Sequence, residues 1–200
     1  MNLVKICGIT EEQEVEYVNE AGVDFMGMVM FFPKSKRNIT VEKASSLIKK
    51  LNPAVTSVTV EPTLDQIREI EAAGIQMIQI HGDISQELLQ EIHIPVIKAF
   101  NVHDLSSYEK YHQADIVKGY IFDAQTPGSG KTFDWSVLSD IPHDEKFALL
   151  AGGLNPDNVA EAFAATHVDG ADTSSGVEND TGIGKDREKI LRFVENVKNQ

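Results

Sequence analysis

A single cysteine and an aspartate close two of the short apolar segments of this 200-residue chain. Cys7 ends the segment Leu3–Cys7, and Asp123 ends Val117–Asp123. A thiolate can act as a base or nucleophile where nearby cations or helix N-termini lower its pKa. A carboxyl group can act as a general acid where an apolar surround or nearby negative charge raises its pKa. Both residues are therefore candidates for acid–base catalysis. The alternatives are that Cys7 is a small buried hydrophobe and that Asp123 caps a loop.

Small residues follow two apolar segments near the end of the chain. They are the pair Gly152-Gly153 and the run Ser174-Ser175-Gly176. Glycine lets a ligand approach the backbone closely, and backbone N–H groups bind phosphate. An acidic protein can hold an anion in this way because the field is local, from backbone dipoles and from a cation such as Arg37. The two runs predict a phosphate site, with two ordinary turns as the alternative.

Two more polar residues belong to apolar segments that read as strands. Lys5 stands two positions before Cys7, so the two side chains share a strand face. If that face points into a barrel, Lys5 needs a carboxylate partner, which the sequence does not identify. His81 closes Met77–His81 and is either an acid–base group or a packing and hydrogen-bonding residue.

The run Pro127–Thr132 is rich in glycine and resembles part of a phosphate-binding P-loop. The full pattern needs a glycine five residues before Gly130, and Gln125 stands there instead. A nucleotide-hydrolase assignment therefore fails. The run is better interpreted as a flexible loop beside Asp123, from which Lys131 could reach an anionic ligand.

Eight short apolar segments alternate with segments of helical spacing, in units of about 25 residues. Nearly continuous apolar runs are typical of strands covered on both faces, and βα alternation implies parallel pairing. The regular count favours a single closed (β/α)8 TIM barrel over an open doubly wound sheet. In such barrels the active site lies at the C-terminal ends of the strands, where the candidate residues stand. The eight predicted strands are Leu3–Cys7, Phe25–Met30, Val55–Val60, Met77–His81, Val96–Phe100, Val117–Asp123, Phe147–Ala151 and Val168–Thr173.

Several residues have the pattern of helix starts. Capping boxes are predicted at Thr10 with Gln13 and at Thr63 with Gln66, and an N-cap at Asn155 before Pro156. Asp134 is a further N-cap candidate for a short sixth helix near Asp134–Asp140. The methionines Met26, Met28 and Met30 are expected to be packing residues rather than part of a cofactor site.

Composition narrows the function classes. Acidic residues outnumber basic ones by 31 to 18, for a net charge of −13, which argues against a nucleic-acid partner. The longest apolar run, Phe25–Phe32, is far below the roughly 20 residues of a membrane span. One cysteine excludes an internal disulfide and a multi-cysteine metal site. We expect a cytoplasmic protein whose residues 1–200 form one catalytic domain.

The motifs in chain order resemble those of phosphoribosylanthranilate isomerases of tryptophan biosynthesis. The resemblance covers nearly the whole chain. It departs from the family at the third strand, which reads Ser57–Glu61 where the family usually ends in asparagine, and at Pro127-Gly128, where the family has paired glycines. The matching motifs are Lys5–Thr10, Pro33–Arg37, Gln79–Gly82, Ile97–Ala99, Gly128–Trp135, Gly152–Pro156 and Asp172–Glu178.

The resemblance implies an Amadori rearrangement of N-(5-phosphoribosyl)anthranilate that needs no metal, redox change or cofactor. It implies that Asp123 is the general acid and Cys7 the general base, and that Arg37 binds the anthranilate carboxylate. His81 is expected to contact substrate, and the phosphate is expected at Gly152, Gly153, Ser174, Ser175 and Gly176. A monomer or homodimer is expected. The alternatives are another phosphosugar barrel enzyme and a non-enzymatic barrel that binds a phosphometabolite.

Overall fold

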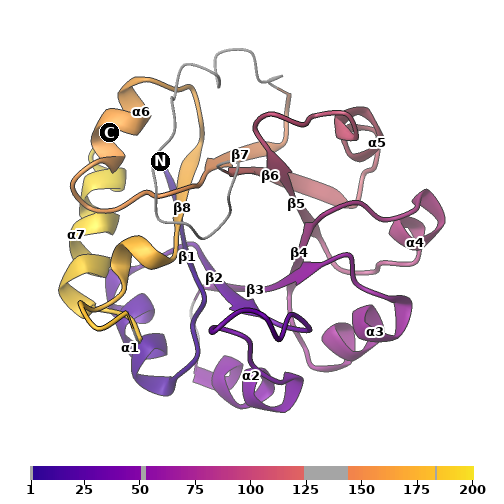
Figure 1. Cartoon of the computed structure of the whole chain (residues 1–200), viewed down its shortest axis with the longest axis horizontal. Helices are drawn as coiled ribbons and strands as arrows, with labels where there is room; N and C mark the ends of the chain where they lie inside the picture. Colours follow the sequence, from indigo (N-terminus) through magenta and orange to yellow (C-terminus); the bar gives the residue numbers. More distant parts are fainter. Residues whose placement is uncertain (1, 51–52, 124–143, 183) are drawn as a thin grey trace.

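The computed structural model describes residues 2–50, 53–123, 144–182 and 184–200. Eight parallel strands pair in chain order and close into a barrel (Figure 1), which confirms the predicted (β/α)8 fold. Each predicted strand is present, with bounds that differ by at most two residues at either end. The strands are β1 (Leu3–Cys7), β2 (Phe25–Val29), β3 (Ala54–Val60), β4 (Met77–His81), β5 (Val96–Asn101), β6 (Val117–Asp123), β7 (Phe147–Leu150) and β8 (Gly170–Thr173).

Helices surround the barrel and cover the outer faces of its strands (Figure 1). The predicted helix near Asp134–Asp140, its Asp134 cap and the glycine-rich run Pro127–Thr132 lie outside the described residues. The described helices are α1 (Glu12–Ala21), α2 (Val41–Leu47), α3 (Leu64–Ala72), α4 (Gln86–Gln90), α5 (Tyr108–His112), α6 (Val159–Ala164) and α7 (Arg187–Lys198), with 3-10 turns η1 (Ile48–Lys50) and η3 (Ser175–Val177).

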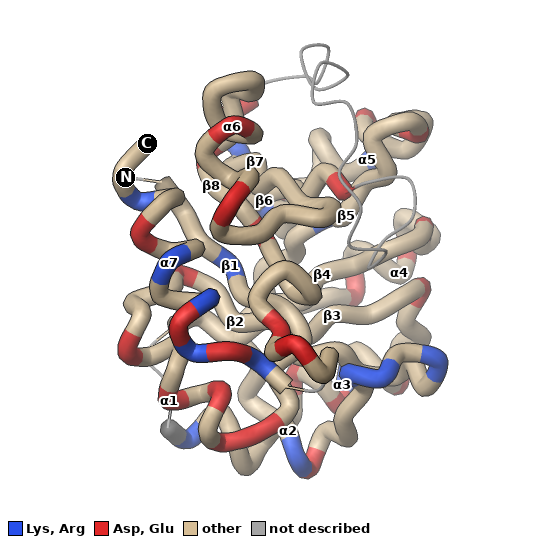
Figure 2. Tube along the Cα trace, turned by 60° about the vertical axis from the view of Figure 1, so that its left-hand side comes forward, with Lys and Arg blue, Asp and Glu red and all other residues tan. Residues whose placement is uncertain are grey.

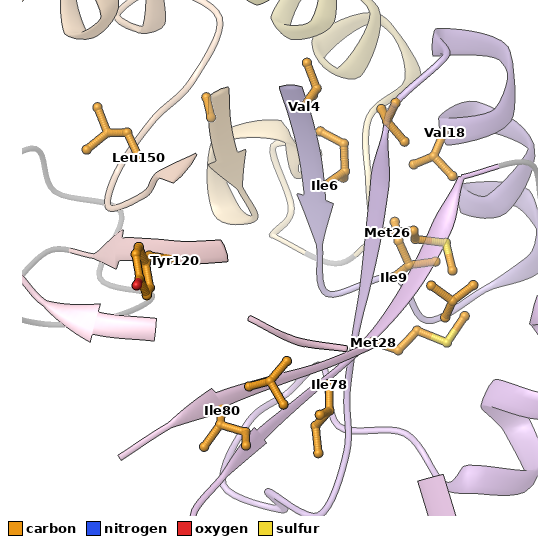
Figure 3. Packing of buried hydrophobic residues seen from close by; sticks show 14 of the residues in the cluster. Val4, Ile6, Ile9, Val18, Met26, Met28, Ile78, Ile80, Tyr120 and Leu150 are labelled. Atoms are coloured by element: carbon orange, nitrogen blue, oxygen red, sulfur yellow. The ribbon is translucent and has the colours of Figure 1, made fainter. Parts of the chain in front are cut away.

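Alternate residues of each strand point outward and pack under the helices. Val4 and Ile6 of β1 and Met26 and Met28 of β2 are each fully buried in this outer layer (Figure 3). The methionines are therefore packing residues, as predicted. Because both faces of every strand are covered, the strands read as nearly continuous apolar runs.

The inward-pointing residues form two different linings. Lys5, Thr56, Gln79 and Asp172 are all buried on the side of β8 and β1 to β4. On the side of β5, β6 and β7 the lining is an apolar cluster, which also includes Met77 of β4; its other buried members are Ile97, Ala99, Ile121, Leu149 and Ala151. Cys7 belongs to the polar side, because it lies two residues after Lys5 on β1.

Two predicted helix starts are wrong and one is confirmed. Thr63 and Gln66 form the capping box that begins α3. The start of α1 lies one residue later than predicted, because the buried Glu14 carboxylate accepts the backbone N–H groups of Thr10 (2.6 Å) and Glu11 (3.1 Å). Thr10 is therefore not the cap.

The start of α6 also lies later than predicted. Asn155 accepts the backbone N–H of Asp157 at 2.8 Å, which makes a turn. The helix begins at Val159, with Asn158 as its N-cap.

Acidic segments outnumber basic ones along the trace, and the two are interspersed (Figure 2). The two ends of the chain lie side by side, with the Asn2 amide donating to the Val197 carbonyl oxygen at 3.0 Å. Among the described helices, none combines the length and the apolar character that a membrane span requires.

Candidate active site

A pocket of about 520 Å³ opens at the C-terminal ends of the strands. Eight of the nine predicted site residues line it: Cys7, Arg37, His81, Asp123, Gly152, Gly153, Ser174 and Ser175. Gly176 does not line it. Gly176 lies against the β7 loop, where an added β-carbon would stand 1.9 Å from the Leu154 carbonyl oxygen. The structure thus brings together residues from all parts of the chain at the end of the barrel where the rule for this fold places catalysis.

Cys7 lies beside a buried ion pair. Lys5 is directly opposite Asp172 in the β1–β8 register. Its Nζ donates to Asp172 Oδ1 at 3.0 Å, with the lysine side chain fully buried. Asp172 is the carboxylate partner that Lys5 was expected to need. Gly27 of the neighbouring strand leaves the space for this group, because a β-carbon there would stand 3.0 Å from both Lys5 Nζ and Cys7 Sγ.

Burial and charge act against each other on these groups. Burial raises the pKa of the Cys7 thiol above its ordinary value, while Lys5 and Lys185 lower it in part. Burial likewise lowers the pKa of Lys5, but Asp172 and Cys7 outweigh this and leave it raised, so Lys5 keeps its charge. Burial raises the pKa of Asp172 against the opposing effect of Lys5. The expected cations are therefore present, but burial keeps the thiol harder to ionise than a free cysteine.

Arg37 is held at the pocket wall by Glu178. Its Nε donates to Glu178 Oε1 at 2.6 Å, and Lys36 Nζ contacts the other carboxylate oxygen at 2.8 Å. Burial alone would raise the pKa of Glu178, but Lys36, Arg37 and Lys185 outweigh this and lower it. The Arg37 side chain runs over Gly8, where a β-carbon would stand 2.3 Å from Arg37 Cδ. Gly8 therefore has to lack a side chain for Arg37 to reach this position.

The glycine pair after β7 and the serines after β8 form another part of the pocket wall. Gly152 and Gly153 have φ angles of 99° and 70°, which favour glycine. The Asn158 amide donates to the Gly153 carbonyl oxygen at 3.0 Å, and Thr173 Oγ1 donates to that of Leu154 at 2.6 Å. These bonds fix the β7 loop against β8.

His81 lines the pocket as a neutral ring. Its Nε2 is hydrogen-bonded to the side-chain amide of Gln79 at 2.8 Å. Burial, and then the charges of Lys98 and Lys5, lower the pKa of His81 to about 4. His81 is therefore suited to hydrogen bonding at neutral pH rather than to carrying charge.

Asp123 ends β6 at the rim of the pocket. Its register partner on β5 is Asn101, which lines the same pocket. The Asp123 carbonyl oxygen accepts the N–H of Val102 at 3.2 Å. The backbone bond fixes the strand end, and the carboxylate stands at the end of the apolar side of the barrel.

Sequence reasoning missed two residues around the site. Glu178 closes a matched motif, but nothing in the sequence showed that it holds Arg37. Lys185 lies in a loop between η3 and α7, and no motif or periodicity in the sequence marks it. Among the described residues, no group of three or more His, Cys, Asp or Glu side chains could hold a metal ion.

Comparisons with known proteins identify the family. The model of the N-(5'-phosphoribosyl)anthranilate (PRA) isomerase family matches residues 4–196. The N-(5'-phosphoribosyl)anthranilate isomerase of Streptococcus gordonii is 40% identical over 201 residues, covering 99% of this chain and 98% of that protein. The crystal structure of phosphoribosyl anthranilate isomerase from Thermotoga maritima has a TM-score of 0.85 and 36% identity, with full coverage of both chains.

A further isomerase structure, in complex with reduced 1-(o-carboxyphenylamino)-1-deoxyribulose 5-phosphate, has a TM-score of 0.84 and 32% identity over the full length of both chains. Together with the pocket that the barrel forms, these similarities show that the chain belongs to the family of N-(5'-phosphoribosyl)anthranilate isomerases.

Proposed function

We propose that Cys7 and Asp123 are the general base and general acid of this isomerase. As a member of the family, the protein catalyses the Amadori rearrangement of N-(5'-phosphoribosyl)anthranilate to 1-(2-carboxyphenylamino)-1-deoxyribulose 5-phosphate, a step of tryptophan biosynthesis. The observation that carries the residue roles is that one pocket contains Cys7, Asp123, Arg37 and the glycine pair.

In the first step Asp123 donates its proton to the furanose ring oxygen. The bond between that oxygen and C1 breaks as the anthranilate nitrogen lone pair forms an iminium, and the aspartate becomes a carboxylate. A positioned acid typically contributes about 10² to 10⁴-fold in rate.

In the second step Cys7 removes the proton from C2. The C–H electron pair moves to form the enolamine and neutralises the iminium nitrogen, and the enolamine then tautomerises to the ketone. Because burial raises the pKa of Cys7, the thiolate needs stabilisation by positive charge. Lys5 supplies part of it, and the iminium beside the sulfur supplies more when the base is needed.

Two parts of the pocket wall hold the two anionic groups of the substrate. The Arg37 guanidinium, fixed through its Nε, offers its terminal nitrogens to the anthranilate carboxylate in a charge-assisted contact. The backbone at Gly153, Ser174 and Ser175 binds the phosphate. Binding the carboxylate and the phosphate at the same time places C1 and C2 of the substrate between Cys7 and Asp123, so that the reacting groups are correctly oriented.

The test is a turnover assay with substrate generated in place from anthranilate and phosphoribosyl pyrophosphate by the preceding enzyme. Loss of substrate fluorescence is followed for wild type, Cys7→Ser and Asp123→Asn side by side. We expect fast decay in the wild type and decay near the spontaneous rate in both variants, with little change in KM. Near-normal kcat in a folded variant would remove that residue from its role.

The remaining properties follow as part of the proposal. Residues 1–200 act as one catalytic domain, in the cytoplasm, on a small phosphosugar-anthranilate substrate without a nucleic-acid partner. A Thermotoga maritima relative is described as a dimeric enzyme from which monomers were generated. A monomer or a homodimer is expected for this chain, and light scattering after size-exclusion chromatography distinguishes the two.

A further inference from the structure

Lys185 is a buried lysine behind the pocket, in the loop between η3 and α7. Its side chain is completely shielded from solvent, and it does not line the pocket. The backbone of Lys185 is fixed on two sides. It pairs with Glu178 in an antiparallel bridge, and its N–H donates to Glu14 Oε1 at 2.8 Å. Burying a lysine ammonium costs free energy unless it is paired, so its contacts indicate what it does in the fold.

The Lys185 ammonium is connected to Cys7 through Ser174. Lys185 Nζ donates to the Ser174 carbonyl oxygen at 2.9 Å and to its hydroxyl oxygen at 3.2 Å. The Ser174 hydroxyl donates to the Cys7 carbonyl oxygen at 2.9 Å. A hydroxyl has one hydrogen, so this contact uses the only one that Ser174 has. The Ser174 side chain thus joins β1 to β8. Its hydroxyl hydrogen is therefore not available to a bound phosphate, which could accept a hydrogen bond from Ser174 only at its backbone N–H.

Four charged or titratable groups act on the Lys185 ammonium. Lys185 Nζ lies 3.8 Å from Glu178 Oε1, and Arg37, Glu14 and Cys7 also act on it electrostatically. Burial lowers the pKa of Lys185 to about 8, although Cys7 and Glu178 partly oppose this. Lys185 therefore carries its charge at neutral pH and loses it as the pH rises through about 8.

The Cys7 thiol meets charges from two elements besides this loop. Lys5, on the same strand, favours its thiolate, and Asp172 on β8 disfavours it. Lys5 is already paired with Asp172 at 3.0 Å, and the charge of Asp172 opposes part of the effect of Lys5 on the sulfur. Lys185 is a second cation near the thiol, and its nearest carboxylate, Glu178, is also bonded to Arg37 and Lys36.

We propose that Lys185 is a positioning residue of the isomerase site, which fixes the Cys7 end of β1 through Ser174 and brings a second buried positive charge to the thiol. This inference rests on the proposed role of Cys7 as the base. Lys185 does not touch the substrate. It acts by keeping Cys7 in place and by favouring its ionised form.

The expected effect on ionisation has a definite sign. Removing a positive charge near a thiol raises the pKa of the thiol. Below that pKa, each unit of increase lowers the thiolate fraction about tenfold. In Lys185→Met we therefore expect kcat/KM near pH 7 to fall about tenfold and to recover as the pH rises. A purely structural role would lower activity by a similar factor at every pH.

The direct measurement is the rate of alkylation of Cys7 by iodoacetamide as a function of pH. The chain has one cysteine, so the signal reports on this thiol alone. The variants are Lys185→Met, which removes donor and charge, and Lys185→Gln, which removes the charge and keeps an amide donor. The matched control is Lys43→Met, which removes one positive charge from an exposed pair with Glu11. Circular dichroism and Tm establish that each variant is folded.

We expect the alkylation rate at pH 7, where Lys185 is charged, to fall about tenfold in both Lys185 variants and to stay unchanged in Lys43→Met. The difference from the wild type should shrink above about pH 8, where Lys185 loses its charge. A rate at pH 7 equal to that of the wild type in folded Lys185→Met and Lys185→Gln would overturn the proposal. So would a lower rate in the methionine variant alone, since the charge would then have no part.

Failure of this inference is distinguishable from failure of the proposed function. If Cys7→Ser retains normal turnover, Cys7 is not the base, whatever the alkylation data show. If Cys7→Ser is inactive while the Lys185 variants keep the wild-type alkylation rate at pH 7 and the wild-type pH dependence of kcat/KM, only the proposed role of Lys185 is wrong.

Discussion

The two linings of the barrel interior differ in kind. On the side of β8 and β1 to β4, the buried inward residues include the ion pair of Lys5 and Asp172 and two polar groups, Thr56 Oγ1 and Gln79 Oε1, that have no hydrogen-bond partner within the described residues. On the side of β5 to β7 the lining is aliphatic. The proposed base stands on the first side and the proposed acid at the end of the second.

This difference fits the two proton transfers. A thiol that must ionise needs nearby cations, and Lys5 and Lys185 supply them on the polar side. Burying these charges costs desolvation free energy. A carboxyl group that must deliver a proton benefits from an apolar neighbourhood. Changes in the apolar lining should therefore alter stability with little effect on turnover, whereas changes on the polar side should alter the ionisation of Cys7 as well as stability.

The largest effect on kcat is expected for Asp123, which ends the apolar side of the barrel. On β6, Asp123→Asn keeps the shape of the side chain and removes its proton, and should lower kcat by about 10² to 10⁴-fold. Ile121→Val, two residues earlier on the same inward face, should cost about 1 kcal/mol of unfolding free energy and leave kcat within about twofold. Steady-state kinetics and urea denaturation of both variants test this. Equal losses of kcat would contradict the separation.

Breaking the buried ion pair on the polar side should lower both the stability of the fold and kcat. Lys5→Met leaves Asp172 without its partner and should destabilise the fold by about 3 to 5 kcal/mol. Asp172→Leu combined with Lys5→Met removes both charges and should recover much of that stability while kcat stays low. Denaturation midpoints decide the first point. A double variant with restored activity would show that the pair does not serve Cys7.

Arg37 should affect binding rather than chemistry. Loss of a charge-assisted hydrogen bond costs about 1.5 to 3 kcal/mol, so Arg37→Met should raise KM by about ten- to one-hundredfold with a smaller change in kcat. Glu178→Gln should move KM in the same direction to a lesser extent, because it only loosens the guanidinium. An unchanged KM in Arg37→Met would mean that another group holds the carboxylate.

His81 should make stability depend on pH. Its pKa in the folded protein is about 4, below the ordinary value of 6.5. As the pH falls from 6.5 towards 4, the unfolded chain binds a proton that the folded one does not, so stability declines across this window. The full shift corresponds to about 3 kcal/mol, and partial exposure of the ring reduces this to about 2 kcal/mol. His81→Gln should flatten the dependence, measured by denaturation at pH 7 and 4.5.

The smallest expected effect is at the end of β3. Glu61 has a φ angle of 44°, a left-handed conformation that costs most L-residues about 1 to 2 kcal/mol and that asparagine adopts readily. Glu61→Asn should therefore stabilise the protein by about 1 kcal/mol, seen as an increase in Tm with kcat unchanged. A lower Tm would show that Glu61 makes contacts that outweigh its backbone strain.

The fold was predictable because its signals are local and repeated. Strands covered on both faces give runs such as Val117–Asp123 that need no knowledge of their partners. Helix starts were less predictable, since the cap of α1 depends on Glu14. This carboxylate also accepts the Lys185 N–H, 171 residues away.

The site was predictable where chemistry stands at strand ends, as at Cys7, Asp123 and the glycine pair. The supporting contacts were not. Glu178 with Arg37 and Lys185 with Ser174 are long-range pairs or loop contacts that no periodicity encodes. The direction of the Cys7 pKa was also beyond the sequence, because burial and charge oppose each other and only the three-dimensional structure shows which prevails.

The most direct test is a crystal structure of this protein with the reduced product analogue that has been bound to a related isomerase. We predict Cys7 Sγ in contact with the carbon equivalent to C2 and the Asp123 carboxyl group on the leaving-oxygen side. The analogue's carboxylate should lie on Arg37, and its phosphate on the backbone of Gly153 and Ser174. A ligand bound in the opposite direction, or with Cys7 remote from that carbon, would contradict the account.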